Sequence, residues 1–311
     1  MKRIILLVLI ALIIFDFPCF NDYAQGDFKI KKGENIFQVA SNLKKQGHIK
    51  SKSVFLMQSL KGTKFKKLKA GNYFLDKEAT SSDILETFVL GVESKKIITI
   101  IPGYTLNEIS RLADNREKFI EKYLYLKEED DALLKEKYSF LKDKPVFVGL
   151  EGYLYPDTYE VLLDEAIVYQ ALSNFDEKLT DDLRVEIEKQ ERTIFDVIIL
   201  ASIIEKEVID YEDKEIVSGI LLKRLKHNML LEVDSTALYP FSQNYDTYIV
   251  SGFPPSPICN PSISSIKAAI YPKETDYFFY LSAKNGETIF SRNFNEHIIN
   301  KFKYLELWIK I

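Results

Sequence analysis

The chain has 311 residues, of which 46% are hydrophobic and 28% charged, so it is long enough to form one or two folded domains. Its formal net charge of −4 excludes a global basic field, and we therefore expect no nucleic-acid partner. The two cysteines, Cys19 and Cys259, do not form a disulfide framework, because Cys19 lies in an apolar N-terminal segment. The three histidines stand far apart without zinc-ligand spacing. We expect no metal and no cofactor.

A basic and then apolar segment opens the chain. Lys2 and Arg3 precede twelve unbroken apolar residues, Ile4 to Phe15, and a further apolar patch reaches Phe20. The basic start predicts that the N-terminus stays in the cytoplasm, that residues 1–24 form a retained membrane anchor, and that everything after about Asn21 is exported. The run is shorter than the about 20 residues of a typical spanning helix. A cleaved signal peptide is the alternative, although no A-x-A-like site follows.

Residues 27–94 have the pattern of a small α+β module. The stretch FKIKKG alternates like a strand, and ENIFQVASNLKKQG places its apolar residues at helical spacing. A second helix is predicted over Ser53 to Leu60, a second strand at LKAGNYFL, and a capped helix at TSSDILETFVLG that ends at Gly91. The module is interpreted either as a structural lead-in or as a glycan-binding module.

A larger mixed α+β unit is predicted over residues 95–311. It begins with the strand KKIITIIPG, and Thr105 with Glu108 three residues later indicates the N-terminus of a short helix. The highly charged stretch from Asn115 to Lys144 is typical of solvated helical faces. The fold class of the whole chain is therefore α+β.

The stretch LASIIEKE places Glu205 at the end of an apolar run. Thr193 followed by Asp196 predicts a helix start, and Glu205 continues one apolar stripe of that helix, with Ile198 and Ala201. A carboxyl in such a place should have a raised pKa, because burial penalises its anion. A raised pKa suits a general acid near neutral pH. The alternative is that the helix reaches the surface at Glu205 and that EKE is a solvated helix end.

Three later stretches are rich in tyrosine, asparagine, serine and carboxylates, which suits a sugar chain. They are LEGYLYPDTYEV, LLEVDSTALYP and the proline-rich NYDTYIVSGFPPSPICNP, after which the chain becomes helical at Ser264. Ordinary turns are the alternative interpretation. The candidate substrate-binding residues in these stretches are Glu151, Tyr153, Tyr155, Glu232, Asp234, Thr236, Tyr245, Thr247, Tyr248 and Asn260.

These stretches resemble the endolytic murein transglycosylase family (MltG, YceG-like). LEGYLYPDTY, LASIIEKE, VDSTALY, YDTYIVSGFPPSPICNP and SIKAAIYP occur in the family's order, and the likeness continues through FFYLSAKNGETIFSRNFNEH. Upstream, GENIFQVASNLKKQGHIKSKSVF, LKAGNYFL and ITIIPGYT also resemble the family. The resemblance covers nearly the whole chain after the N-terminal segment.

The resemblance implies an enzyme of cell-wall biogenesis that cleaves the glycan strands of peptidoglycan internally. It implies a LysM-like module over 27–94 and a YceG-like catalytic domain over 95–311. It also implies a single-pass anchor in the inner (cytoplasmic) membrane before them, with the domains on the periplasmic, extracytoplasmic side. The family's essential glutamate falls on Glu205, with Glu151 in the same cleft. The chain departs from the family at Glu232, where glutamine is usual, and at Ser262, which replaces a glycine. If Glu232 lies near Glu205, its charge should raise the pKa of the acid further.

The expected activity is that of a lytic transglycosylase, a lyase that acts on a polysaccharide. Protonated Glu205 would donate to the glycosidic oxygen between N-acetylmuramic acid and N-acetylglucosamine, and would then take the proton of the C6 hydroxyl as a 1,6-anhydro ring closes. The expected partners are glycan strands and peptidoglycan synthases (penicillin-binding proteins). Two alternatives stay open: a hydrolase that pairs Glu205 with Glu151 or Glu232, and a non-catalytic peptidoglycan-binding scaffold that recruits synthases.

Overall fold

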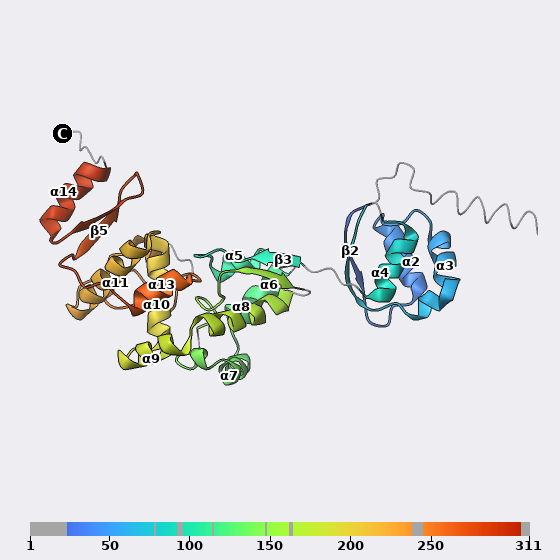
Figure 1. The fold of residues 1–311 in the computed structure, drawn as a ribbon, viewed down its shortest axis with the longest axis horizontal. Helices are drawn as coiled ribbons and strands as arrows, with labels where there is room; N and C mark the ends of the chain where they lie inside the picture. The colour runs from blue at the N-terminus through green and yellow to red at the C-terminus, as the bar shows by residue number, and fades with distance from the viewer. Residues whose placement is uncertain are drawn as a thin grey trace, which may run out of the picture. The chain divides into compact units, whose positions relative to one another are not determined.

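The computed structural model describes residues 24–77, 79–91, 96–113, 115–146, 148–161, 164–237 and 245–305. The chain divides into two compact units, Met1–Lys96 and Ile97–Ile311, and Figure 1 shows the elements of each. Of the anchor predicted over 1–24, all but the last residue lies outside the described residues. In the described part, no helix has both the length and the apolar character needed to cross a membrane.

The first unit is a two-stranded antiparallel sheet packed with helices. Strand β1 (Gly26–Ile30) pairs with β2 (Gly71–Leu75), with Phe28 opposite Tyr73. Helices α2 (Ile36–Lys45) and α3 (Lys52–Leu60) and the 3₁₀ helix η1 (Lys61–Lys66) lie between the strands in sequence, and α4 (Ser81–Leu90) follows them. This order of elements agrees with the order predicted from the sequence.

Local sequence signals set the helix ends of this unit. Asn35 caps α2 in a capping box with Gln38, and Thr80 caps α4 in the same way with Asp83. Helix α4 ends at Gly91, whose left-handed backbone (φ 70°) is the conformation that glycine adopts without steric cost. The unit has its own core, in which Phe28 and Tyr73 pack against Phe88.

The second unit contains both helices and strands along its whole length. Its opening elements are β3 (Lys96–Thr99), which starts at the boundary, α5 (Leu106–Ser110), α6 (Arg116–Tyr123), α7 (Glu128–Lys137), η2 (Ser139–Leu141), β4 (Thr158–Val161), α8 (Asp164–Lys178) and α9 (Asp181–Lys189). β3 pairs with β4. The charged stretch 115–144 forms α6, α7 and η2, which bury part of their apolar residues, among them Phe119 and Leu134.

The later elements of this unit follow one buried helix, α10 (Ile194–Glu207). They are α11 (Tyr211–Lys226), α12 (Asp234–Ala237), α13 (Ile263–Ile270), β5 (Phe279–Ser282), β6 (Thr288–Ser291) and α14 (Phe294–Leu305). Every residue from Val197 to Ile204 is buried, because α10 packs against α11, α12 and α13. β5 and β6 form an antiparallel pair that α14 contacts (Figure 1).

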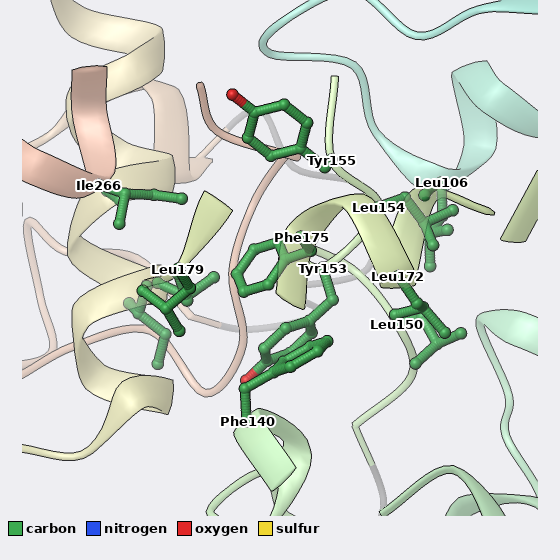
Figure 2. Packing of buried hydrophobic residues seen from close by; sticks show 14 of the residues in the cluster. Leu106, Phe140, Leu150, Tyr153, Leu154, Tyr155, Leu172, Phe175, Leu179 and Ile266 are labelled. Atoms are coloured by element: carbon green, nitrogen blue, oxygen red, sulfur yellow. The ribbon is translucent and has the colours of Figure 1, made fainter. Parts of the chain in front are cut away.

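Aromatic side chains fill part of the core of the second unit. Figure 2 shows Tyr153 close to Phe140 and Phe175, with Leu150 and Leu154 nearby. The ring centroids of Phe140 and Phe175 are 4.7 Å apart, and that of Tyr153 lies 5.7 Å from Phe175. The turn that carries Tyr153 begins at Gly152, which has a φ of 89°.

We expect Gly152→Ala to destabilise the protein strongly. The added Cβ would lie 2.6 Å from Pro257 Cβ and 2.8 Å from Ile198 Cγ2, in addition to the strain of a positive φ. Gly286→Ala is the matched control, because Gly286 has a φ of 88° but no atom within 4 Å of the added Cβ. Denaturant unfolding should show a loss of about 2–4 kcal/mol at Gly152 and about 1 kcal/mol at Gly286. Equal losses would contradict the close contacts.

Candidate active site

The C-terminal turn of α10 carries two glutamates, Glu205 and Glu207, with different surroundings. Residues two positions apart on an α-helix point about 200° apart around its axis. Glu205 contacts the start of α13, whereas Glu207 contacts β5. The sequence EKE therefore supplies two separate carboxyl sites from one helix end.

Glu205 binds the N-terminus of α13 through a single oxygen, Oε2. The backbone N–H of Ser262 donates to this atom at 2.9 Å, the Ser265 hydroxyl donates at 2.6 Å, and the Ser262 hydroxyl donates as well. The ammonium of Lys214 on α11 lies 3.5 Å away. Only 10% of the Glu205 side chain is exposed. These contacts tie α10, α11 and α13 together.

The predicted rise in the pKa of Glu205 is wrong. Burial of the carboxyl does favour its neutral form, but the hydrogen bonds from Ser262 and Ser265 and the charge of Lys214 favour the carboxylate more strongly. The pKa of Glu205 is therefore held below its ordinary value. Glu232, which was expected to raise this pKa, is not among the groups that act on it. In the folded protein Glu205 is a stabilised anion.

Glu207 has the electrostatic setting that the sequence suggested for Glu205. Burial raises the pKa of the Glu207 carboxyl, and the nearby charge of Asp234 adds to that rise. The Tyr280 hydroxyl donates to Glu207 Oε2 at 3.2 Å and offsets part of it. Tyr280 is a weak acid here, since burial and the charge of Glu207 raise its own pKa. Hydrogen bonds from Ser235 also oppose the rise, and the pKa of Glu207 still lies above its ordinary value.

Glu207 lines a pocket of about 430 Å³ in the C-terminal part of the second unit. Two carboxylates on its wall already have partners. Glu232 accepts a hydrogen bond from Arg224 at 2.9 Å, and Asp234 accepts one from the Tyr248 hydroxyl at 2.6 Å. Aromatic side chains and a histidine on β5 and α14 complete the wall: Phe279, Tyr280, Phe294 and His297.

The predicted site residues fall into three groups. Glu232, Asp234 and Tyr248 line the pocket with Glu207. Thr236 and Thr247 are buried beside it, where their hydroxyls share a hydrogen bond of 2.8 Å and the Thr247 hydroxyl accepts the backbone N–H of Val233. These two threonines hold the loop that carries Glu232 and Asp234.

Glu151 and Asn260 belong to a second group, which lies in a buried polar network. Glu151 accepts the backbone N–H of Leu106 at 3.0 Å and the Asn260 side-chain amide at 3.1 Å. Asn260 also accepts the backbone N–H of Leu154 at 2.8 Å. Both side chains are buried, so their observed contacts join loops of the unit.

The tyrosines form the third group and differ in exposure. Tyr153 is fully buried in the core of Figure 2 and presents no surface to a ligand. Tyr155 is 8% exposed and packs against the same core. Tyr245 is partly exposed, and its hydroxyl donates to the backbone carbonyl of Ser251 at 3.4 Å. None of the three is among the pocket-lining residues.

Most pocket residues were not singled out from the sequence, and four of them matter most for the chemistry: Glu207, Arg224, Tyr280 and His297. For Glu207 the signal was present, because EKE contains two glutamates, but helical spacing placed only Glu205 on the apolar stripe. No sequence signal marked the other three. Among the described residues, His, Cys, Asp and Glu side chains form no group of three or more that could hold a metal ion.

The fold and the pocket define an α+β protein with three carboxyls, those of Glu207, Glu232 and Asp234, in a cavity partly lined by aromatic side chains. The chain belongs to the YceG-like family, which matches residues 28–303.

Curated relatives include the endolytic murein transglycosylase of Bacillus subtilis (strain 168), which is 27% identical over 90% of this chain and 84% of its own length. The endolytic murein transglycosylase of Streptococcus pneumoniae serotype 2 (strain D39 / NCTC 7466) is 25% identical over 86% of this chain, which spans 56% of that protein. Among solved structures, the crystal structure of a putative yceG-like protein from Listeria monocytogenes has a TM-score of 0.59 and 26% identity. That match covers 89% of this chain and 99% of the Listeria chain.

The two glutamates should affect stability with opposite signs. The lowered pKa of Glu205 means that its carboxylate stabilises the fold above the ordinary carboxyl pKa of about 4.5, and that this contribution is lost as the pH falls through the lowered value. Glu205→Gln should therefore cost about 1–3 kcal/mol at pH 7, measured by urea unfolding, with a smaller loss at pH 4.

Glu207→Gln is the matched variant. The raised pKa of Glu207 means that ionisation opposes folding as the pH rises above about 4.5, so this variant should keep or gain stability at pH 7. An equal loss of stability in both variants would contradict the difference between the two carboxyl environments.

Proposed function

We propose that this protein is an endolytic lytic transglycosylase of peptidoglycan. It cleaves the bond between N-acetylmuramic acid and N-acetylglucosamine within glycan strands and leaves 1,6-anhydro-N-acetylmuramic acid ends. Membership of the YceG-like family and the names of the curated relatives support this reaction. The observation that carries the proposal is the partly buried Glu207 carboxyl, which lines the pocket and has a pKa above its ordinary value.

Within this proposal, Glu207 replaces Glu205 as the acid. A general acid must hold a proton near the working pH and must reach the substrate. Of the two glutamates, Glu207 fits these conditions better, because its pKa is raised above the ordinary value and it lines the pocket. Glu205 is held as an anion by Ser262, Ser265 and Lys214, and it does not line that pocket. Its role is to position the last turn of α10, and with it Glu207.

The reaction needs one carboxyl in two successive roles. Glu207 donates its proton to the glycosidic oxygen as the bond from C1 of the muramic sugar to that oxygen breaks. The resulting carboxylate then accepts the proton of the C6 hydroxyl of the same sugar. The freed oxygen attacks C1 and closes the 1,6-anhydro ring, so the proton returns to Glu207 and no water is consumed. Burial of Glu207 supports both steps, because it favours the protonated start and limits competing water.

We expect Glu207→Gln to abolish cleavage. The amide keeps the shape of the side chain but neither donates nor accepts the transferred proton, and general acid–base catalysis contributes about 10² to 10⁴-fold. The measurement is incubation with purified glycan strands followed by mass analysis of the product ends. Glu205→Gln is the matched control, and it should retain more cleavage than Glu207→Gln because it alters only the anchor of α10.

Each other result has a definite meaning. Loss of cleavage in Glu205→Gln with full cleavage in Glu207→Gln would return the acid role to Glu205. Products of the unmodified protein that carry only reducing ends, heavier by one water, would identify a hydrolase. Binding of glycan without any turnover would identify a non-catalytic scaffold.

We further infer that residues 1–24 anchor the protein in the inner membrane and that residues 27–94 form a LysM-like glycan-binding module. The apolar run after Lys2 and Arg3 supports the anchor. The β1–α2–α3–β2 order with its own core supports the module. Peptidoglycan synthases are proposed as partners at that membrane.

Removal of residues 1–24 should release the protein from membranes while its binding to purified peptidoglycan persists. The apolar run accounts for membrane attachment, and the module accounts for glycan binding. Membrane fractionation and sedimentation with peptidoglycan measure the two properties. A reporter fused after Ile311 should work only outside the cytoplasm. If the chain without residues 1–24 stayed in the membrane, the anchor would be contradicted. The glycan-binding module requires a second result, namely that removal of residues 27–94 abolishes binding to peptidoglycan.

A further inference from the structure

His297 on α14 is a buried polar residue that lines the same pocket as Glu207. It is 8% exposed. Its Nδ1 is sealed from solvent and has no hydrogen-bond partner in the described part of the chain. The imidazole is held in place by Phe279, whose ring stacks on it at a centroid distance of 5.2 Å and an interplanar angle of 25°. Because Nδ1 is closed off, Nε2 is the ring nitrogen that remains for a ligand in the pocket.

The surroundings of His297 keep its imidazole neutral. Burial lowers its pKa, and the charges of Lys301 and Arg224 lower it further, while Glu232 acts in the opposite sense. A proton on Nδ1 would create a buried N–H without an acceptor, so the single proton of the neutral ring belongs on Nε2. His297 therefore presents one uncharged donor.

The walls of the pocket differ in chemistry around this donor. Phe279 and Phe294, whose ring centroids are 5.9 Å apart, provide apolar surface beside His297. Asp234 and Glu232 provide carboxylate acceptors for hydroxyl groups elsewhere on the wall. A neutral group with a strong carbonyl acceptor and a methyl fits next to His297, and sugar hydroxyls fit next to the carboxylates.

We propose that His297 is a substrate-contacting residue that selects N-acetylated sugars, by donating from Nε2 to the carbonyl oxygen of a 2-acetamido group. Phe279 and Phe294 receive the methyl of that group. A sugar with a free amine offers neither the carbonyl nor the methyl, and it places an ammonium near Arg224 and Lys301. This inference rests on the proposed function, because it assumes that a glycan occupies the pocket of Glu207.

The test measures binding in a chain that does not cleave. In the Glu207→Gln background, calorimetry compares the β-1,4-linked tetramer of N-acetylglucosamine with its fully de-N-acetylated counterpart. His297→Ala should weaken binding of the acetylated tetramer about tenfold and remove most of the preference for it. His297→Gln should restore much of the affinity, since its amide N–H₂ can replace the Nε2–H donor.

His227→Ala is the matched control. His227 is exposed, lies outside the pocket, and its Nδ1 is 2.8 Å from the backbone carbonyl of Lys223. This variant should leave affinity and preference unchanged. With glycan strands and intact Glu207, His297→Ala should raise KM more than it lowers kcat.

The inference is overturned if the acetylated tetramer does not bind, or if His297→Ala keeps both its affinity and its preference. It is also overturned if His297→Gln behaves like His297→Ala in a folded protein. The proposed function fails in a different way, since the unmodified protein would then yield no 1,6-anhydro ends from glycan strands whatever the tetramer measurements show.

Discussion

The contact between Glu205 and the N-terminus of α13 is the interaction on which the site depends. One carboxylate oxygen accepts hydrogen bonds from the first residues of a helix, where backbone N–H groups and the helix dipole both favour an anion. Lys214 adds a cation from α11. Since α10 is buried along Val197 to Ile204, fixing its last turn fixes the direction of every side chain there. The position of Glu207 therefore depends on the contact between Glu205 and α13.

The two glutamates illustrate how burial alone does not decide a pKa. Both carboxyls are largely withdrawn from water, so desolvation raises the pKa of each. Around Glu205 three hydrogen-bond donors and an ammonium reverse the effect. Around Glu207 the charge of Asp234 reinforces it, and hydrogen bonding offsets only part. The two carboxyls are only two residues apart in sequence, but one is a structural anion and the other is a candidate acid.

Much of the fold could be predicted from local sequence patterns. Capping residues at Thr80, Thr105 and Thr193 marked helix starts, and Gly91 marked an end, because these signals depend only on neighbouring residues. The choice between Glu205 and Glu207 could not be made this way. It depends on Ser262 and Tyr280, which lie more than fifty positions later in the chain, and helical periodicity contains no information about them.

The same long-range dependence explains the candidate pocket residues. Glu232, Asp234 and Tyr248 came from a stretch whose composition suits a sugar, and the structure places them in the pocket. Tyr153 came from a stretch whose composition suits a sugar equally well, but its ring packs in the core with Phe140 and Phe175. Composition identifies residues that could bind a glycan, but the packing of distant elements decides which of them face a cavity.

The partners of the remaining carboxylates favour a one-carboxyl reaction over hydrolysis by two. A retaining or inverting hydrolase needs a second carboxylate free to attack the sugar or to activate water. Glu232 is bound by Arg224 and Asp234 by Tyr248, and Glu151 is buried against Leu106 and Asn260. Each of these contacts lowers the availability of a lone pair for attack. In the proposed reaction, the substrate's own C6 hydroxyl is then the nucleophile that this arrangement leaves, and Glu207 is the group proposed to activate it.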